Sequence, residues 1–153
     1  MKKTIQDEPV GLLQEYRRKR NFSRTSEPAP DNRICRKKSV NHELLFVIQK
    51  HDATRLHYDF RLEMDGVLKS WAVPKGVPFK KGEKHLAVHV EDHPMDYARF
   101  EGTIPSGSYG AGTVMVWDIG TYTVKGADPI KALEAGKLHV ILKGKKLNGE
   151  WAL

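Results

Sequence analysis

Two histidines, an aspartate and an arginine lie close together in one short stretch of this 153-residue sequence. If residues 56–63 form a strand, the two-residue alternation of strand side chains places His57, Asp59 and Arg61 on one face. The aromatic and aliphatic residues between them take the opposite face. His51 lies just upstream across a predicted turn, and can return to the same place. The pattern predicts a row of ionisable groups backed by an apolar surface.

Such a row has the composition of a metal site. Two imidazoles and one carboxylate can occupy one face of an octahedral metal ion and leave positions for water and substrate, and manganese, zinc and iron all accept such ligands. Arg61 beside them could hold a phosphate through two hydrogen bonds. The alternative is an ordinary solvated strand face, and if the sequence offered only His57 and Asp59, this alternative would be the better interpretation. His51, Arg61 and a further histidine downstream weigh against that alternative.

The downstream histidine is His93, which precedes a proline that ends a strand. As an imidazolium it could donate to a phosphate oxygen or protonate a leaving group, and the competing interpretation is a surface loop histidine. Lys75, between Pro74 and Gly76 at another strand end, could contact phosphate or only solvate its turn. The glycine-rich stretch at 105–112 lacks the Lys-Ser/Thr ending of a phosphate-binding loop, so it is interpreted first as a tight turn.

The elements that must position these residues are predicted to be short strands separated by Gly- and Pro-bearing turns. Asp65-Gly66 and Asn148-Gly149 predict hairpin turns. Asp128 before a proline predicts a short connecting helix over 129–135. Strands are predicted at 44–50, 56–63, 67–73, 85–91, 113–117, 121–125, 137–142 and 150–153. This all-β pattern fits a barrel or a sandwich, and we expect a compact closed β-barrel of about eight strands because closure removes exposed edges.

The N-terminal part differs from this core. Residues 1–40 hold eleven Lys and Arg against five Asp and Glu, whereas the remaining 113 residues hold fifteen against fourteen. A helix is expected over 9–20 and an extended segment over 21–39. We therefore expect a basic arm over 1–40 on a core over 41–153, in one domain. Such an arm could bind a polyanion or serve only as a solvated tail.

The composition indicates the cellular compartment expected for the protein. The single cysteine, Cys35, cannot form an internal disulfide, and no apolar run has the length of a membrane span or a signal peptide. We expect a cytoplasmic monomer that does not engage a membrane.

In combination, several segments closely resemble the 3′-phosphoesterase domain of bacterial DNA ligase D. They are residues 46–53, 56–63, 68–76, 91–94 and 109–112. The resemblance implies a compact β-barrel, a manganese-type divalent metal (Zn²⁺ or Co²⁺ as alternatives), and trimming of the 3′ ends of DNA or RNA–DNA in repair. It implies removal of a 3′-phosphate and, in a linked reaction, of a terminal ribonucleoside. It also implies that a separate ligase and polymerase act in trans.

By position, the resemblance assigns roles to ten residues and marks one departure. His51, His57 and Asp59 match the metal ligands, and Arg61 and His93 match groups that engage the scissile phosphate. Gln49, Lys75 and Tyr97 match supporting active-site positions. In the arm, Arg20 and Glu27 match residues near the substrate, whereas Asn21 stands where the family usually has Asp.

Two other function classes fit the same residues. One is a non-catalytic module that holds DNA ends through its basic arm. The other is a barrel oxygenase that uses two histidines and a carboxylate to bind iron. Arg61 beside the expected metal favours phosphate chemistry over oxygen chemistry.

Overall fold

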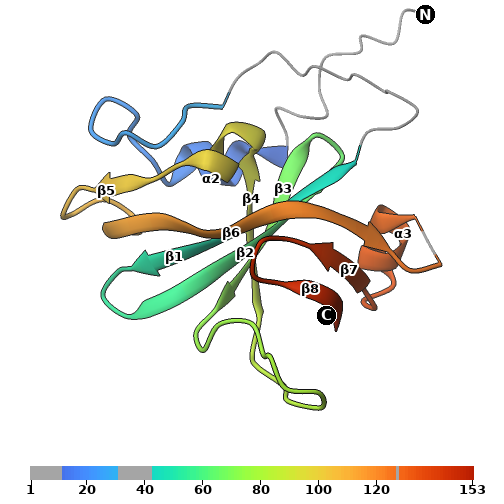
Figure 1. Ribbon diagram of the computed structural model, residues 1–153. Helices are drawn as coiled ribbons and strands as arrows, with labels where there is room; N and C mark the ends of the chain where they lie inside the picture. Colours follow the sequence, from blue (N-terminus) through green and yellow to red (C-terminus); the bar gives the residue numbers. More distant parts are fainter. Residues whose placement is uncertain (1–11, 31–42, 127) are drawn as a thin grey trace, which may run out of the picture.

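The computed structural model describes residues 12–30, 43–126 and 128–153, which form one curled antiparallel sheet with three short helices (Figure 1). Its order is β4-β3-β2-β1-β6-β7-β8, and β5 pairs with β6 off this path. The strands are β1 (Leu44–Asp52), β2 (Leu56–Met64), β3 (Val67–Val73), β4 (Val88–Pro94), β5 (Gly102–Ile104), β6 (Gly112–Val124), β7 (His139–Lys143) and β8 (Asn148–Ala152). The helices are α2 (Gln14–Arg18), the 3₁₀ helix η1 (Met95–Arg99) and α3 (Pro129–Glu134).

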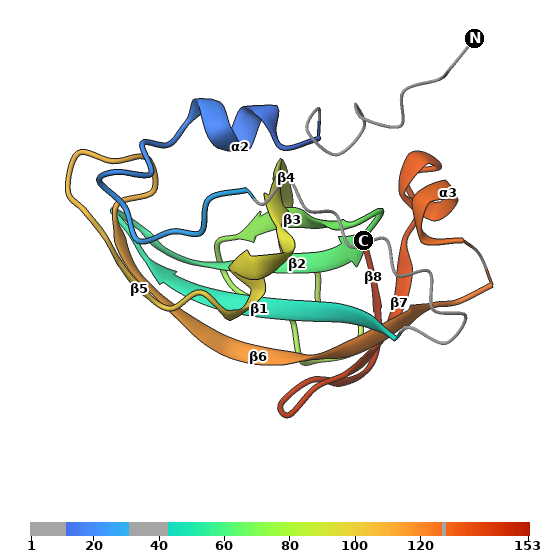
Figure 2. The ribbon, with the colours of Figure 1, turned by 90° about the horizontal axis from the view of Figure 1, so that it is seen from above.

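The all-β class is confirmed, but the closed barrel expected from the sequence is not. The sheet ends at β4 on one side and β8 on the other, and these strands do not pair with each other. Figure 2 shows the result, a curled half-barrel with α2 lying across one side of the sheet. Strand alternation defines which face each side chain takes, whereas closure needs a pairing between distant strands that alternation does not encode.

One long strand, β6, replaces the two strands predicted at 113–117 and 121–125. Gly120 falls in the gap between the two predicted strands, yet it lies inside β6. A Cβ there would come within 2.0 Å of the carbonyl oxygen of Lys143, so glycine is required for the close approach of β7. The short strand β5 was not predicted, and the strand expected at 85–91 begins at Val88.

The hairpin turn predicted at Asn148-Gly149 was also wrong, because both residues belong to β8. The chain reverses earlier, where Gly144 N–H donates to the carbonyl of Leu147 at 2.8 Å. The buried carboxylate of Asp118 accepts from the N–H groups of residues 145, 146 and 147 at 2.8–3.1 Å. A side chain from β6 therefore organises this turn.

Two local predictions are confirmed. Asp65 and Gly66 have φ values of 54° and 78°, as a tight hairpin between β2 and β3 requires. Asp128 caps α3 by accepting from the N–H groups of Ile130 and Lys131. Of the helix predicted over 9–20, α2 is observed, and residues 9–11 lie outside the described residues.

Both faces of the sheet are covered, and β1 shows how. Phe46 and Ile48 enter a core beneath β7, β8 and α3, whereas Val47 packs in a second core with α2 and η1. In the second core Tyr16 of α2 is fully buried, and its hydroxyl donates to the carbonyl of Pro28 at 2.6 Å. The arm residues 12–30 are thus part of the packed structure. Among the described residues no helix is long and apolar enough to cross a membrane.

Candidate metal and phosphate site

The three expected metal ligands meet on the face of the sheet that the arm covers. His51 and His57 are directly opposite each other in the β1–β2 ladder, and Gln49 is opposite Asp59. Side chains of such cross-strand pairs lie on the same face. One ligand atom each from His51, His57 and Asp59 lies within 4.8 Å of the others. This spacing leaves room for an ion with bonds of roughly 2.0–2.2 Å.

Backbone carbonyls set which nitrogen of each histidine faces the centre. His51 Nε2 donates to the carbonyl of Gly110 at 2.7 Å, and His57 Nδ1 donates to that of Arg55 at 3.0 Å. The other nitrogens, Nδ1 of His51 and Nε2 of His57, lie 3.4 and 3.3 Å from the carboxylate of Asp59. Carbonyl bonds of this kind orient metal-binding histidines in proteins. The ring orientations therefore fit a cation between the three side chains.

The electrostatics of the cluster also fit a cation between these side chains. Burial opposes ionisation of Asp59, but Arg61 and the two histidines outweigh it and hold the pKa of that carboxyl well below its usual range. The hydrogen bond to Asp59 raises the pKa of His57, although partial burial works against this. The centre thus favours a positive charge, which a proton or a metal ion can supply.

Arg61 is held rigidly beside these ligands. Its Nε donates to Gln49 Oε1 at 2.7 Å, and its Nη2 lies 3.5 Å from Asp59 Oδ2. The fully buried amide of Gln49 is itself fixed, because its Nε2 donates to the carbonyls of Tyr97 and Phe100 at 2.7 and 3.1 Å. The remaining nitrogen, Nη1, is buried and has no hydrogen-bond partner among the described residues. A buried guanidinium nitrogen without a partner needs an acceptor, and phosphate oxygens have the matching geometry.

His93 joins the site at the end of β4, but in a state different from the expected imidazolium. Burial, followed by Arg61 and Arg20, lowers the pKa of His93 well below its ordinary value. Its Nδ1 donates to the carbonyl of Glu91 at 2.9 Å, and its Nε2 lies 3.3 Å from Arg20 Nη2 and accepts from it. The ring is therefore neutral at pH 7.

The arm is bonded to this site through a buried carboxylate. Glu27 accepts from Arg20 Nε at 2.7 Å and from the hydroxyl of Tyr97 at 2.9 Å. The ring of Tyr97 in turn contacts Arg61, whose guanidinium carbon is 4.8 Å from the ring centroid. Asn21 is exposed, and its side-chain oxygen accepts from the N–H and hydroxyl of Ser23. Arg20, Glu27 and Tyr97 thus form one network, whereas Asn21 shapes the adjacent turn.

Lys75 is exposed in the turn after β3. The pairing of Tyr58 with Val73 puts this turn near the His57 end of β2. The sequence did not predict a role for Gly110, whose carbonyl accepts from His51, or for Glu91. The carboxylate of Glu91 lies 3.2 Å from Lys19 Nζ and 3.4 Å from Arg20 Nη1. No sequence signal marks a backbone carbonyl as the hydrogen-bond partner of a histidine side chain.

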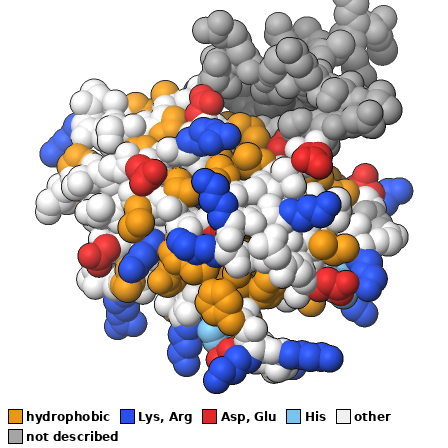
Figure 3. Space-filling model, in the orientation of Figure 1, with side chains coloured by type: hydrophobic (Ala, Val, Ile, Leu, Met, Phe, Trp, Pro, Cys, Tyr) orange, Lys and Arg blue, Asp and Glu red, His pale blue; other side chains and the backbone are white. Residues whose placement is uncertain are grey.

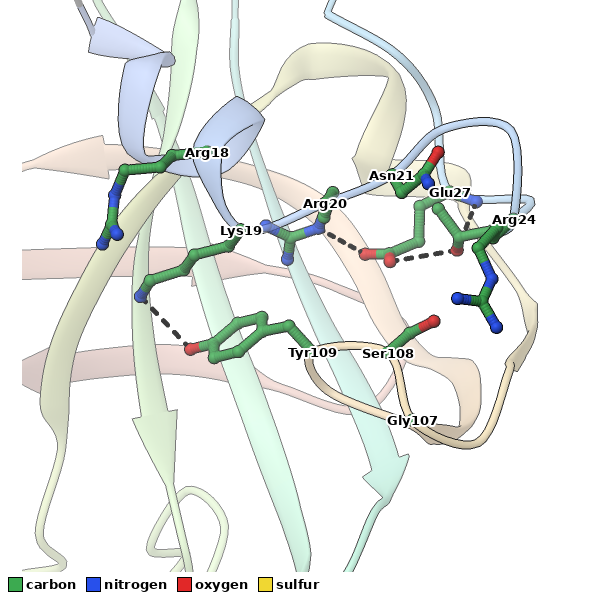
Figure 4. A pocket seen from close by; sticks show the side chains of 10 residues that line it. Arg18, Lys19, Arg20, Asn21, Arg24, Glu27, Gly107, Ser108 and Tyr109 are labelled. Atoms are coloured by element: carbon green, nitrogen blue, oxygen red, sulfur yellow. Dashed lines mark hydrogen bonds and ion pairs between the residues drawn. The ribbon is translucent and has the colours of Figure 1, made fainter.

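A cavity of about 290 Å³ lies between the arm and the loop over 105–111 (Figure 4). Its basic lining residues are Arg18, Lys19, Arg20 and Arg24. Figures 1 and 2 both show the arm beside this loop at the same end of the sheet. The cavity adjoins the candidate metal site, because Arg20 donates to His93 and the carbonyl of Gly110 in the loop accepts from His51.

The chain is similar in sequence to known end-joining proteins. The chain is 57% identical over 141 residues to a multifunctional non-homologous end joining protein LigD of Pseudomonas aeruginosa, covering 92% of this chain and 16% of that relative. It is 50% identical over 150 residues to a multifunctional non-homologous end joining DNA repair protein LigD of Mycobacterium tuberculosis, covering 96% and 19%. With a LigD of Mycolicibacterium smegmatis it shares 45% over 153 residues, covering 96% and 20%.

The chain thus spans a fifth or less of the length of these relatives. Residues 49–153 match the family described as the DNA Ligase D 3′-phosphoesterase domain. This match includes all three candidate metal ligands, Arg61 and His93. The chain belongs to the DNA ligase D 3′-phosphoesterase domain family.

Proposed function

We propose that this chain is a metal-dependent phosphoesterase that removes 3′-phosphates from DNA or primer–template ends during end-joining repair. The observation that carries the proposal is the position of Arg61. Its buried Nη1 has no hydrogen-bond partner among the described residues, and its Nη2 lies 3.5 Å from the carboxylate of a candidate metal ligand. A phosphate oxygen at this point would pair that nitrogen beside the metal.

Each residue has a role in this proposal. His51, His57 and Asp59 hold a divalent ion, Mn²⁺ by family resemblance with Zn²⁺ or Co²⁺ as alternatives. When bound, such an ion supplies Lewis acidity and lowers the pKa of a coordinated water. Arg61 binds and orients the phosphate, and Gln49 fixes the plane of its guanidinium. These preformed donors stabilise the charge that develops as the phosphoryl group transfers.

The other candidate residues have supporting roles in this proposal. His93, which the family resemblance assigns to the scissile phosphate, accepts from Arg20 at its neutral ring and orients that guanidinium toward the phosphate, and Tyr97 and Glu27 hold the arm against the site. Lys75 contributes positive charge at the end near His57. Arg20, bonded to both Glu27 and His93, links the arm to the phosphate site.

We propose that terminal ribonucleosides are removed less efficiently than 3′-phosphates, because Asn21 replaces a family Asp. An amide keeps the size of that side chain but loses its charge. The substitution Asn21→Asp should therefore raise ribonucleoside release relative to phosphate release from matched ends. An unchanged ratio of the two products would remove Asn21 from this account.

The central experiment replaces His57 or Asp59 by Ala and measures phosphate release from a 3′-phosphorylated primer–template with Mn²⁺, Zn²⁺ and Co²⁺. Phosphate release should be lost, and calorimetry should show weakened metal binding. His139→Ala is the matched control, because His139 lies on β7 and contacts Glu150 instead. Unchanged turnover in the Asp59 variant would overturn the proposal. Salt-sensitive binding of DNA ends without product would indicate a binding module, and metal-dependent oxygen uptake would indicate an oxygenase.

A further inference from the structure

The cavity between the arm and the 105–111 loop contains an exposed aromatic ring that the phosphate site does not use. Tyr109 is 49% exposed, and its hydroxyl accepts from Lys19 Nζ at 3.4 Å. The same ammonium lies 4.6 Å from the ring centroid, and the guanidinium carbon of Arg20 lies 5.5 Å from it. The ring is therefore exposed to solvent yet flanked by two cations.

Surface charge alone does not locate a binding site. In the view of Figure 3, Lys and Arg side chains are spread over the face, with Asp and Glu between them. Within the cavity, Lys19 and Arg20 already pair with Glu91. The guanidinium of Arg24 is exposed and has no hydrogen bond or ion pair among the described residues (Figure 4). This cation is available to an incoming anion.

The cavity is joined directly to the metal site. Gly110 follows Tyr109 in the chain, and its carbonyl accepts from the ligand His51 at 2.7 Å. Turns stiffen the loop, because Ser108 N–H donates to Pro105 and Ala111 N–H donates to Ser108, each at 3.1 Å. A group bound against Tyr109 would therefore have a defined position relative to a phosphate at Arg61.

We propose that this cavity binds the nucleotide that carries the 3′-terminal phosphate, with its base stacked on Tyr109 and a backbone phosphate held by Arg24. An aromatic face combined with cations along one groove is how proteins bind single nucleic-acid strands without sequence preference. The cavity volume of about 290 Å³ is at the lower end of ligand sites, roughly 300–1,000 Å³, and suits one nucleotide unit. The inference rests on the proposed function, since it places that unit beside the phosphate site.

The test measures binding without turnover, by anisotropy of labelled primer–templates ending in 3′-phosphate, in EDTA. Tyr109→Ala should weaken binding about tenfold, the loss expected for one base–aromatic stack. Tyr109→Phe keeps the ring and should stay within about threefold of the starting affinity. Phe79→Ala is the matched control, because Phe79 is 68% exposed and packs on Trp117 instead of in the cavity.

A substrate whose terminal nucleotide lacks its base separates stacking from other effects. The unsubstituted protein should bind this end about tenfold more weakly than the normal end. Tyr109→Ala should bind both ends equally, because its stack is already absent. Equal losses in both proteins, or equal affinity of both for the normal end, would refute the stack. Thermal melting of Tyr109→Ala establishes that the fold is retained.

The role of Arg24 is tested through salt. Arg24→Ala should reduce the slope of log affinity against log salt by about one phosphate contact, whereas Lys137→Ala, an exposed cation next to α3, should leave it unchanged. An unchanged slope in Arg24→Ala would overturn the phosphate contact. If 3′-phosphate release persists while the stack is absent, only this inference fails. If the stack is present but no phosphate is released, only the proposed function fails.

Discussion

Replacing Arg61 by Lys keeps a positive charge but removes the planar guanidinium. In the structure Arg61 donates to Gln49, approaches Asp59 and keeps one nitrogen unpaired among the described residues. A single ammonium cannot occupy all three positions. Losing one preorganised donor to a transferring group costs about 2.7–4 kcal/mol, so kcat/KM for 3′-phosphate release should fall about 10²- to 10³-fold.

The same substitution has a separate effect on stability. The carbonyl oxygen of Gln49 would lose its partner while remaining buried, at a cost of about 1–3 kcal/mol. For a chain of this length the melting temperature should fall by about 2–10 °C. Because Arg61 is not a metal ligand, Mn²⁺ affinity measured by calorimetry should change much less than kcat/KM.

The assay is steady-state phosphate release from a 3′-phosphorylated primer–template, at a temperature where each variant is folded. Arg99→Lys is the matched control, because Arg99 is exposed on η1. If Arg61→Lys melts at a lower temperature but turns over within about threefold of the starting rate, Arg61 is structural and does not stabilise a transition state.

Three further predictions concern stability. Asp118→Asn should cost about 3 kcal/mol, because a carboxylate that accepts several backbone N–H groups is replaced by an amide that also donates; urea unfolding measures the loss, and a cost below about 0.5 kcal/mol would contradict it. Folding keeps His93 neutral with its pKa below 6.5, so the unfolded state binds more protons and stability should decline as pH falls below about 6.5. Urea unfolding between pH 7 and pH 5 measures this decline, and the stability of His93→Gln should depend less on pH. If the variant shows the same decline, a group other than His93 causes it. Glu27→Gln should weaken the contact with Arg20 by about 1.5–3 kcal/mol and increase hydrogen exchange over residues 12–30, whereas unchanged exchange would mean that other contacts hold the arm.

Local chemistry in the sequence was enough to predict the candidate ligands and the strand face that carries them. Alternation along β2 placed His57, Asp59 and Arg61 together, and the structure confirms this with Phe60 and Leu62 in the opposite core. The Asp65-Gly66 turn was predictable for the same reason, since neighbouring residues alone dictate its backbone angles. The family resemblance, carried by motifs along most of the chain, is also confirmed by comparison with the LigD relatives.

Tertiary structure decided what depends on distant residues. The sheet stays open because β4 and β8 do not pair, and Gly120 marks the close approach of β7 where a turn was expected. It also decided the state of His93, since burial and nearby arginines keep its ring neutral. Hydrogen bonds to backbone carbonyls, such as that from His51 to Gly110, cannot be predicted from the pattern of side chains in the sequence. The sequence therefore determined which candidate groups share one strand face, and long-range packing determined their orientation, charge and neighbours.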